Sequence, residues 1–483
     1  MSASVSTTNA AQAAQPGGRL RTQHLLLMIV AAAAPLGVAI GNLPTGILLG
    51  NGIGLPAAFL AAGLVIACLV TGFMRLAREV RADGGFADLV RAGLGSGLGL
   101  GTAYLTGIAY WTGALSLAAA TGYFGNIIGS MHGVDLPWWA YTFAAFALVT
   151  VLGRRAADLS ARLLVVLMAA EIAVVLVMDA AIVVNHGLDA FPLDVFSLGN
   201  AFSGNLGPAV LVGFTSFIGV ESAVLYTREA RDPARSVPRA TYAAVVAIAL
   251  LYVVTAWLVI GSVGTAAAVE TAGQLQGELV FAVALGEVNQ TFLDVTQVFF
   301  VTSLLACFVA LHNASARYAQ TLANRGALPG LMAAVHPRHL SPATASTVLG
   351  ALGTALFVVF ALVGADPYIG LATSLTGLFT LGIVAAQALV SISVVVYFVR
   401  RGHRAGWSTV VAPALGAIGA LLACVAIVAN YSVLTGKDSL GAHLVPLVLL
   451  VALAGGYALW AWRSLRGEHD ADLLPAPSLV GEL

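Results

Sequence analysis

The chain has 483 residues, of which 59% are hydrophobic and only 9% are charged, and its mean hydropathy is +0.93. An ordinary soluble domain carries roughly 25% charged residues, so this composition excludes a soluble globular protein and predicts an all-α integral membrane protein in a lipid bilayer. The 22 basic and 22 acidic residues balance, which gives no sign of a nucleic-acid partner.

Residues with catalytic or metal-binding chemistry are sparse. Cys68, Cys307 and Cys424 lie far apart in apolar runs and match no metal-ligand spacing, so we expect neither a disulfide nor a bound metal. The apolar segments contain no recognisable set of nucleophile, acid-base or metal-ligand residues. We therefore expect no enzymatic activity and no cofactor.

Twelve apolar segments are long enough to cross a bilayer, which takes about 20 residues in a helix. The first is too long for the apolar core of a signal peptide, so we expect it to remain in the protein. Polar tails, which we expect to be cytoplasmic, cover residues 1–23 and 467–483, and the first of them is predicted to be disordered. The spans begin near Leu25, Pro56, Gly97, Trp138, Leu159, Phe202, Ala240, Thr291, Ser341, Tyr368, Thr409 and His443.

Basic residues separate cleanly between the two sides of these spans. All 21 arginines lie before span one, after span twelve or in the connections that follow the other even-numbered spans, all of which are on one side of the membrane. Only Lys437 falls on the other side. Since Lys and Arg accumulate on the cytoplasmic side, both termini are predicted to be cytoplasmic. The excess of Arg over Lys, together with abundant Ala, Gly and Val, suggests a GC-rich bacterial genome and hence the bacterial cytoplasmic (inner) membrane.

Spans one and six are interrupted by helix-breaking residues. Span one contains PLGVAIGNLP (residues 35–44), and span six contains TSFIGVESA (residues 215–223). The two breaks lie five spans apart, so their helices cross in opposite directions. Paired breaks of this kind point to a transporter binding site at mid-membrane, whereas the alternative reading is close helix packing through small residues.

The freed backbone groups at such breaks suggest the chemistry of a substrate. Amides at the start of a half-helix suit a carboxylate, and carbonyls at the end of the other half suit an ammonium group. One ligand that carries both groups is an α-amino acid. A diamine or monoamine could use the carbonyls alone, so the amine is the better supported half of this prediction.

Three further stretches complete a recognisable order of motifs. REARDPARSVPRAT (residues 228–241) follows the break in span six, RADGGFADLVRAGLG (residues 81–95) precedes span three, and LHNASARYAQTLANRGALP (residues 311–329) leads out of span eight. In this order and spacing the chain resembles the amino acid/polyamine/organocation (APC) superfamily of secondary transporters.

The resemblance implies a fold and a mode of transport. The fold is the LeuT type, in which two inverted five-helix repeats surround a central site and broken helices 1 and 6 contribute to it. By position, the first repeat covers residues 24–185, the second covers residues 202–400, and spans eleven and twelve cover residues 401–466. Alternating access around this site is implied as the transport mechanism.

The resemblance also places the substrate site, and aromatic residues near the breaks are candidate gates. The family's glycine-rich break falls on Gly37 to Gly41, although VAIGN lacks the G-S-G or G-A-G triplet of known members. Thr215 stands where arginine/agmatine antiporters carry a bulky tryptophan, which argues against that activity. Of the aromatic residues near the breaks, Phe217 and Tyr110 are the predicted gates, with simple packing as the alternative. The implied substrate-binding residues are Gly37, Val38, Ala39, Ile40, Gly41, Asn42, Thr215, Ser216, Phe217, Ile218 and Gly219.

Ionisable residues within spans are costly and are candidates for coupling. Glu171 lies roughly 18 Å into span five at 1.5 Å per residue, where some proton-coupled members carry a lysine in place of a sodium ion. Glu221 follows the break in span six and is the second candidate for proton coupling. A structural role is the alternative for both, and it is the expected role for Asp179 and His312.

The predicted function is proton-coupled uptake of a small amino acid or related amine. Two alternatives are an obligate exchanger and a nutrient sensor that binds its ligand without moving it. The sequence leaves the exact substrate open, and it leaves both a monomer and a homodimer open.

Overall fold

The computed structural model describes residues 22–80, 85–155, 161–223, 231–339 and 341–467, and in these ranges the chain is helical and has no strand. Most of the predicted tails, residues 1–21 and 468–483, lie outside the described residues. So do residues 224–230, at the start of the predicted loop between spans six and seven.

Ten helical segments of the described chain are long and apolar enough to cross a membrane. The protein is therefore a multi-pass membrane protein. The segments are Thr22–Gly41, Gly52–Val80, Val165–Ala190, Leu206–Ala223, Arg235–Val263, Gln290–Asn324, Ala343–Leu362, Pro367–Arg400, Trp407–Ala429 and Leu440–Leu465.

Two more helices lie where the sequence predicts spans three and four. The first, α6 (Ser96–Met131), has 36 residues and is rich in Gly, Ser and Thr, which lower its hydropathy. The second, α7 (Trp138–Arg154), has 17 residues, which is short for a membrane crossing of about 20. These two helices fit the predicted positions, and the count of twelve spans stays a prediction.

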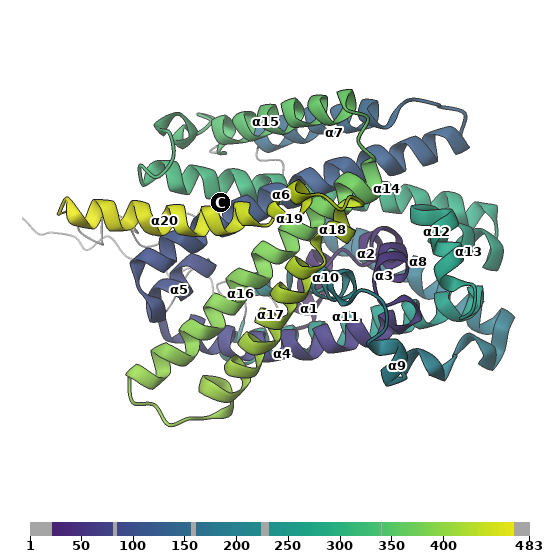
Figure 1. Ribbon diagram of the computed structural model, residues 1–483, viewed down its shortest axis with the longest axis horizontal. Coiled ribbons are helices and arrows are strands. Elements are labelled where there is room, and N and C mark those ends of the chain that lie inside the picture. Colours follow the sequence, from purple (N-terminus) through teal and green to yellow (C-terminus); the bar gives the residue numbers. More distant parts are fainter. Residues whose placement is uncertain (1–21, 81–84, 156–160, 224–230, 340, 468–483) are drawn as a thin grey trace, which may run out of the picture.

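The helices follow the predicted order along the chain (Figure 1). Their bounds are α1 (Thr22–Ala32), α2 (Pro35–Gly41), α3 (Leu43–Leu49), α4 (Leu55–Val80), α5 (Phe86–Leu94), α8 (Ala161–His186), α9 (Leu198–Ala201), α10 (Leu206–Thr215), α11 (Pro233–Val263), α12 (Ala268–Leu275), α13 (Leu279–Glu287), α14 (Gln290–Asn324), α15 (Ala343–Leu362), α16 (Ser374–Arg400), α17 (Ala412–Ala429), α18 (Tyr431–Thr435), α19 (Leu440–Leu444) and α20 (Leu447–Leu465). Short turns of helix join them, including the π-helix η7 (Pro367–Thr373), which leads directly into α16.

Helix packing is reciprocal between the two predicted repeats. Helix α1 packs against α11 and α10 packs against α4, so the first helix of each predicted repeat contacts the second helix of the other. Corresponding helices also pair, with α6 against α14 and α7 against α15, and the α7–α15 pair lies along the top edge in Figure 1. This pattern is what two inverted repeats would produce, and the repeat itself stays a prediction.

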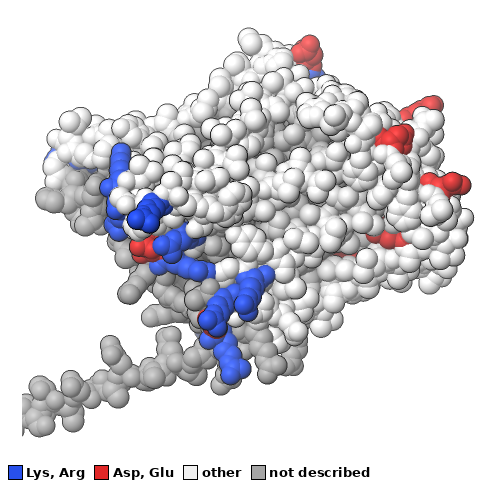
Figure 2. All heavy atoms as spheres, turned by 90° about the horizontal axis from the view of Figure 1, so that it is seen from below, with Lys and Arg blue, Asp and Glu red and all other residues white. Residues whose placement is uncertain are grey.

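Charge divides the molecule along its long axis. Figure 2 shows Lys and Arg gathered toward one end, while most Asp and Glu lie toward the other. The first, called here the Arg-rich end, holds the last residues of α4, α16 and α20, and the second, the acidic end, holds α12 and α13 (Figure 1). By the positive-inside rule the Arg-rich end is predicted to be cytoplasmic.

Candidate functional site

The first span is broken between α1 and α2, at Ala33 and Ala34. Ala34 has a φ of 46°, one of two positive φ values among the described non-glycine residues. Pro35 follows directly and begins α2, and because proline disfavours a right-handed helical conformation in the residue before it, α1 cannot continue into α2. The proline, and not the glycines, therefore determines where this span breaks.

The predicted break at Gly37 to Gly41 is corrected by this finding. These residues are helical, since Val38 donates its amide to Ala34 O at 3.2 Å and Asn42 donates to Val38 O at 3.0 Å. The helix resumes as α3 after Asn42, whose carbonyl accepts from the amide of Gly46. The amides of Val38 to Gly41 serve the helix and are not free to hold a substrate carboxylate.

The second break follows α10 at the predicted place. The helix ends at Thr215, and residues 216–219 form turns before a short 3₁₀ stretch. Gly219 has a φ of 110°, a conformation that side chains other than glycine adopt only with strain. Its amide donates to Glu221 Oε2 at 2.9 Å, so this carboxyl satisfies a backbone group that the break exposes.

A cavity of about 670 Å³ lies between the two broken spans. Its walls come from α2, α6, α10, α14 and α16. Toward the Arg-rich end the lining continues through Asp88, Arg317 and Arg325. The volume is typical of a site for a small molecule.

Most of the predicted site residues lie on this cavity. The described lining includes Gly37, Val38, Gly41, Asn42, Tyr110, Thr215, Ile218, Gly219 and Glu221. Ala39 and Ile40 are instead buried in the core, and Ser216 turns its hydroxyl back to Val212 O at 2.7 Å. The helical period explains the split, because only one face of α2 turns toward the cavity.

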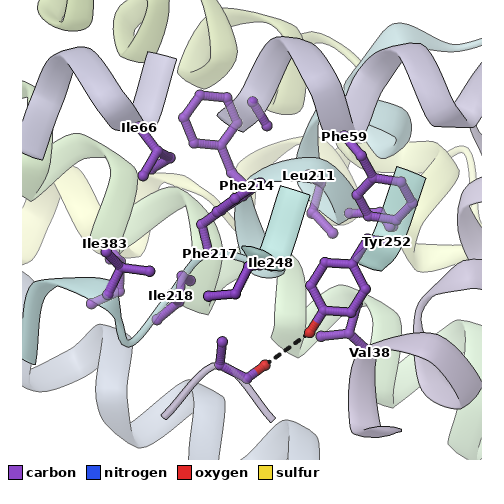
Figure 3. Close-up of a cluster of buried hydrophobic side chains, with 14 of the residues drawn as sticks. Val38, Phe59, Ile66, Leu211, Phe214, Phe217, Ile218, Ile248, Tyr252 and Ile383 are labelled. Carbon is purple, nitrogen blue, oxygen red and sulfur yellow. Dashed lines mark hydrogen bonds between the residues drawn. The ribbon is translucent and has the colours of Figure 1, made fainter. Parts of the chain in front are cut away.

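The structure does not place Phe217 as a gate. The residue is fully buried, and its ring lies so close to Gly63 of α4 that a Cβ atom there would come within 3.1 Å of it. Figure 3 shows it among Ile66, Phe214 and Ile248, in the apolar core. Phe217 lies two residues before Gly219, and the turn there directs its side chain away from the cavity. The prediction of Phe217 as a gate is corrected accordingly.

Tyr110 is the other predicted gate, and its ring faces the cavity. The ring stacks on Tyr318 of α14 with 5.6 Å between centroids, and Phe379 of α16 lies 6.2 Å away. Glu221 lies within electrostatic range of both tyrosines. These rings border the part of the cavity between the breaks and the Arg-rich end, so Tyr110 stays our proposed gate on that side.

Aromatic residues that the sequence did not single out border the cavity toward the acidic end. The Tyr368 hydroxyl donates to Gly41 O at 3.0 Å and accepts from the Thr45 hydroxyl at 3.1 Å. Its ring stacks on Tyr123 with centroids 4.5 Å apart, and Phe124 packs edge-on against it. Tyr368 belongs to the π-helix η7, a local irregularity that no pattern in the sequence reveals.

Glu171 of α8 lies beside the first break and not on the cavity. Its carboxyl interacts with the backbone of Leu36 and with the hydroxyl of Ser303 on α14. Tyr252 of α11 and Cys307 of α14 lie within electrostatic range of it. The Tyr252 hydroxyl donates to Ala33 O at 3.1 Å, the bond drawn as a dashed line in Figure 3, so both side chains serve the same break.

The two remaining ionisable candidates lie away from the cavity. His312 is buried, and its Nε2 lies 2.8 Å from the hydroxyl of Ser346 on α15, consistent with the expected packing role. Asp179 is also buried and accepts a hydrogen bond from Thr255 of α11 at 2.8 Å. Among the described residues, no group of three or more His, Cys, Asp and Glu side chains lies close enough to hold a metal ion.

An all-helical, multi-pass protein with two broken spans around a central cavity has the architecture of a membrane transporter. The family described as amino acid permease matches residues 20–454. The chain therefore belongs to the amino acid permease family, within the amino acid/polyamine/organocation superfamily, and it is a transporter.

Curated relatives and solved structures agree with this class. The chain is 29% identical over 333 residues to uncharacterized transporters of Mycobacterium tuberculosis and Mycobacterium bovis, covering 68% of this chain and 69% of each relative. Its fold is similar to crystal structures of the Eremococcus coleocola manganese transporter. A histidine-to-alanine mutant of that transporter matches with a TM-score of 0.55, and its complex with an aromatic bis-isothiourea substituted compound matches with 0.54. Both comparisons have 16% identity and cover 94% of this chain and 97% of the other.

Proposed function

We propose that this transporter takes up a small amino acid or related amine by alternating access, driven by protons. The bacterial cytoplasmic membrane, with both termini in the cytoplasm, is the proposed location. The cavity between the two breaks carries the proposal, because it gives one site to which both predicted repeats contribute. We also propose that the repeats are of the inverted five-helix LeuT type.

The lining of the cavity near the breaks suits a small, partly apolar ligand. The side chains of Asn42, Thr215 and Thr376 supply neutral hydrogen-bonding groups, and Val38 and Ile218 supply apolar surface. The Thr215 hydroxyl also forms a hydrogen bond of 2.5 Å with the Thr380 hydroxyl. Carbonyls and hydroxyls of this kind are acceptors for an ammonium group, so the amine remains the better supported half of the substrate.

Glu171 is the proposed proton carrier, because it lies where a change of charge would act on the first break. Its carboxyl contacts Leu36, just after the break, and Ser303 on α14. A carboxylate interacts favourably with the start of a helix, and protonation weakens that interaction. Binding or release of a proton would therefore change how α1 and α2 are held against α8 and α14.

The test is uptake by purified protein in liposomes. A thermal-shift panel of amino acids and amines first selects a ligand. A gradient of one pH unit supplies about 1.4 kcal/mol per proton, enough for tenfold accumulation at one-to-one coupling. We expect an inward proton gradient to accelerate wild-type uptake and Glu171→Gln to abolish the acceleration. Glu270→Gln, which neutralises an exposed carboxyl of α12, is the matched control and is expected to behave as wild type.

Other results would assign a different function. Uptake that requires preloaded substrate would indicate an obligate exchanger, and ligand binding without flux would indicate a sensor. Because the similar solved structures are manganese transporters, the panel includes Mn²⁺. Uptake of Mn²⁺ without uptake of any amine would refute the proposed substrate.

A further inference from the structure

We propose that Asp179 is a second proton-carrying residue, which passes protons between the acidic end of the molecule and Glu171. The inference rests on the proposed proton-coupled function and adds a residue and a route to it. The sequence alone favoured a structural role for Asp179, and its surroundings in the fold point to the new one.

The surroundings of Asp179 are unusual for a carboxyl group. The residue is 5% exposed. One carboxyl oxygen accepts from the Thr255 hydroxyl at 2.8 Å, and the other, Oδ1, has no hydrogen-bond partner among the described residues. In the described part of the chain, no Arg, Lys or His forms an ion pair with it. A buried carboxylate without a cation or a full set of donors is costly, and the cost falls when it binds a proton.

Asp179 lies between two other titratable residues on the same helix. Along α8, Glu171 precedes it by eight residues and His186 follows it by seven. These are about two helical turns, or roughly 12 and 10 Å along the axis. His186 Nε2 pairs with Glu287 Oε1 of α13 at 2.8 Å, and the two side chains are 33% and 13% exposed. Solvent therefore reaches the helix at this pair, next to the acidic end.

A hydroxyl group of α11 lies near each of the two carboxyl groups, Thr255 beside Asp179 and Tyr252 within electrostatic range of Glu171. Thr255, which donates to Asp179, lies three residues after Tyr252, so both are on one face of α11. Tyr252 donates to Ala33 O at the break beside Glu171. A hydroxyl both accepts and donates, and each of these two can therefore receive one proton while releasing another.

The transfer balances without any other reactant. The Asp179 carboxylate takes a proton from the acidic end and becomes a carboxylic acid. The acid gives that proton to the Thr255 oxygen as Thr255 passes its own proton to the Tyr252 oxygen, and Tyr252 leaves its bond to Ala33 O and passes its own proton to the Glu171 carboxylate. Asp179 is then again a carboxylate, both hydroxyls are neutral, and Glu171 is a carboxylic acid. In this structure, fully buried Ile182 lies on α8 between Asp179 and the His186–Glu287 pair. The route is interrupted there, as coupled transport without a proton leak requires.

The test separates proton movement from substrate movement. In liposomes we measure uptake driven by an inward proton gradient, and exchange with equal substrate and equal pH on both sides, which needs no net proton transfer. We expect Asp179→Asn to slow driven uptake at least tenfold and to leave exchange within twofold of wild type. Thr255→Val is expected to slow driven uptake to a smaller extent, and Asp179→Glu to restore it. Asp189→Asn, at an exposed acid near the end of α8, is the matched control.

Three results would overturn the proposal. If the wild type responds to the gradient and Asp179→Asn responds equally, Asp179 carries no proton and only this inference fails. Loss of uptake and exchange together in Asp179→Asn, without rescue by Asp179→Glu, would show a structural role. If wild-type uptake ignores the gradient, the proposed coupling fails, and the route through Asp179 fails with it.

Discussion

The Tyr368→Phe substitution removes a single hydroxyl group. It tests whether the hydrogen bonds of that hydroxyl keep the cavity closed at the acidic end. The phenol bonds to Gly41 O at 3.0 Å and to the Thr45 hydroxyl at 3.1 Å, and it stacks on Tyr123. Phenylalanine keeps the ring and loses both hydrogen bonds. At about 0.5–1.5 kcal/mol net for each bond, the closed state loses about 1–3 kcal/mol.

That loss predicts a measurable shift between conformations. If the bonds exist only when the acidic end is closed, a change of about 1–3 kcal/mol raises the open population by about 5- to 150-fold. Gly41→Cys provides a reporter, because a Cβ atom at Gly41 meets no heavy atom of the described residues within 4 Å and the residue lines the cavity. The assay is the labelling rate of this cysteine by a membrane-impermeant maleimide. The reagent is added at the predicted outer face of a variant whose three native cysteines are replaced by Ala.

The control removes an equally buried hydroxyl elsewhere. Tyr431 is fully buried and donates to Ser374 O at 2.6 Å, but it does not line the cavity. We expect Tyr431→Phe to leave the labelling rate unchanged. Labelling of the Tyr368→Phe protein within twofold of wild type would refute the role of this hydroxyl in closing the acidic end.

Two further predictions concern the break in span six. Glu221→Gln replaces the charge-assisted bond to the Gly219 amide with a neutral one, so we expect thermal unfolding in detergent to reveal a loss of about 1 kcal/mol, while uptake stays proton-driven. Loss of the gradient response in this variant would instead make Glu221 a coupling residue. Phe217→Leu removes part of a ring packed beside Gly63, so we expect about 1 kcal/mol lower stability and an unchanged KM. An altered substrate preference would return Phe217 to the binding site.

The sequence predicted where helices begin more surely than how they break, and the direction in which each helix crosses the membrane stays a prediction. Apolar length and the segregation of arginine are properties of chain segments, so they can be read without neighbours. The break in span one was misplaced by a few residues, because Gly37 and Gly41 fit within a helix when neighbouring helices pack around it. Pro35 restricts Ala34 whatever the surroundings, and this local constraint was the stronger signal.

The sequence by itself determined a multi-pass helical membrane protein with two interrupted spans, and it predicted that Glu171 lies near mid-membrane. Only the tertiary structure decided which side chains contact one another and which line the cavity. It turned Phe217 into the core and Tyr110 toward the cavity, brought Tyr368 against Gly41, and set Thr255 beside Asp179. The last two contacts join residues 327 and 76 positions apart. Helix rotation and packing fix such contacts, and a single sequence carries no local signal of either.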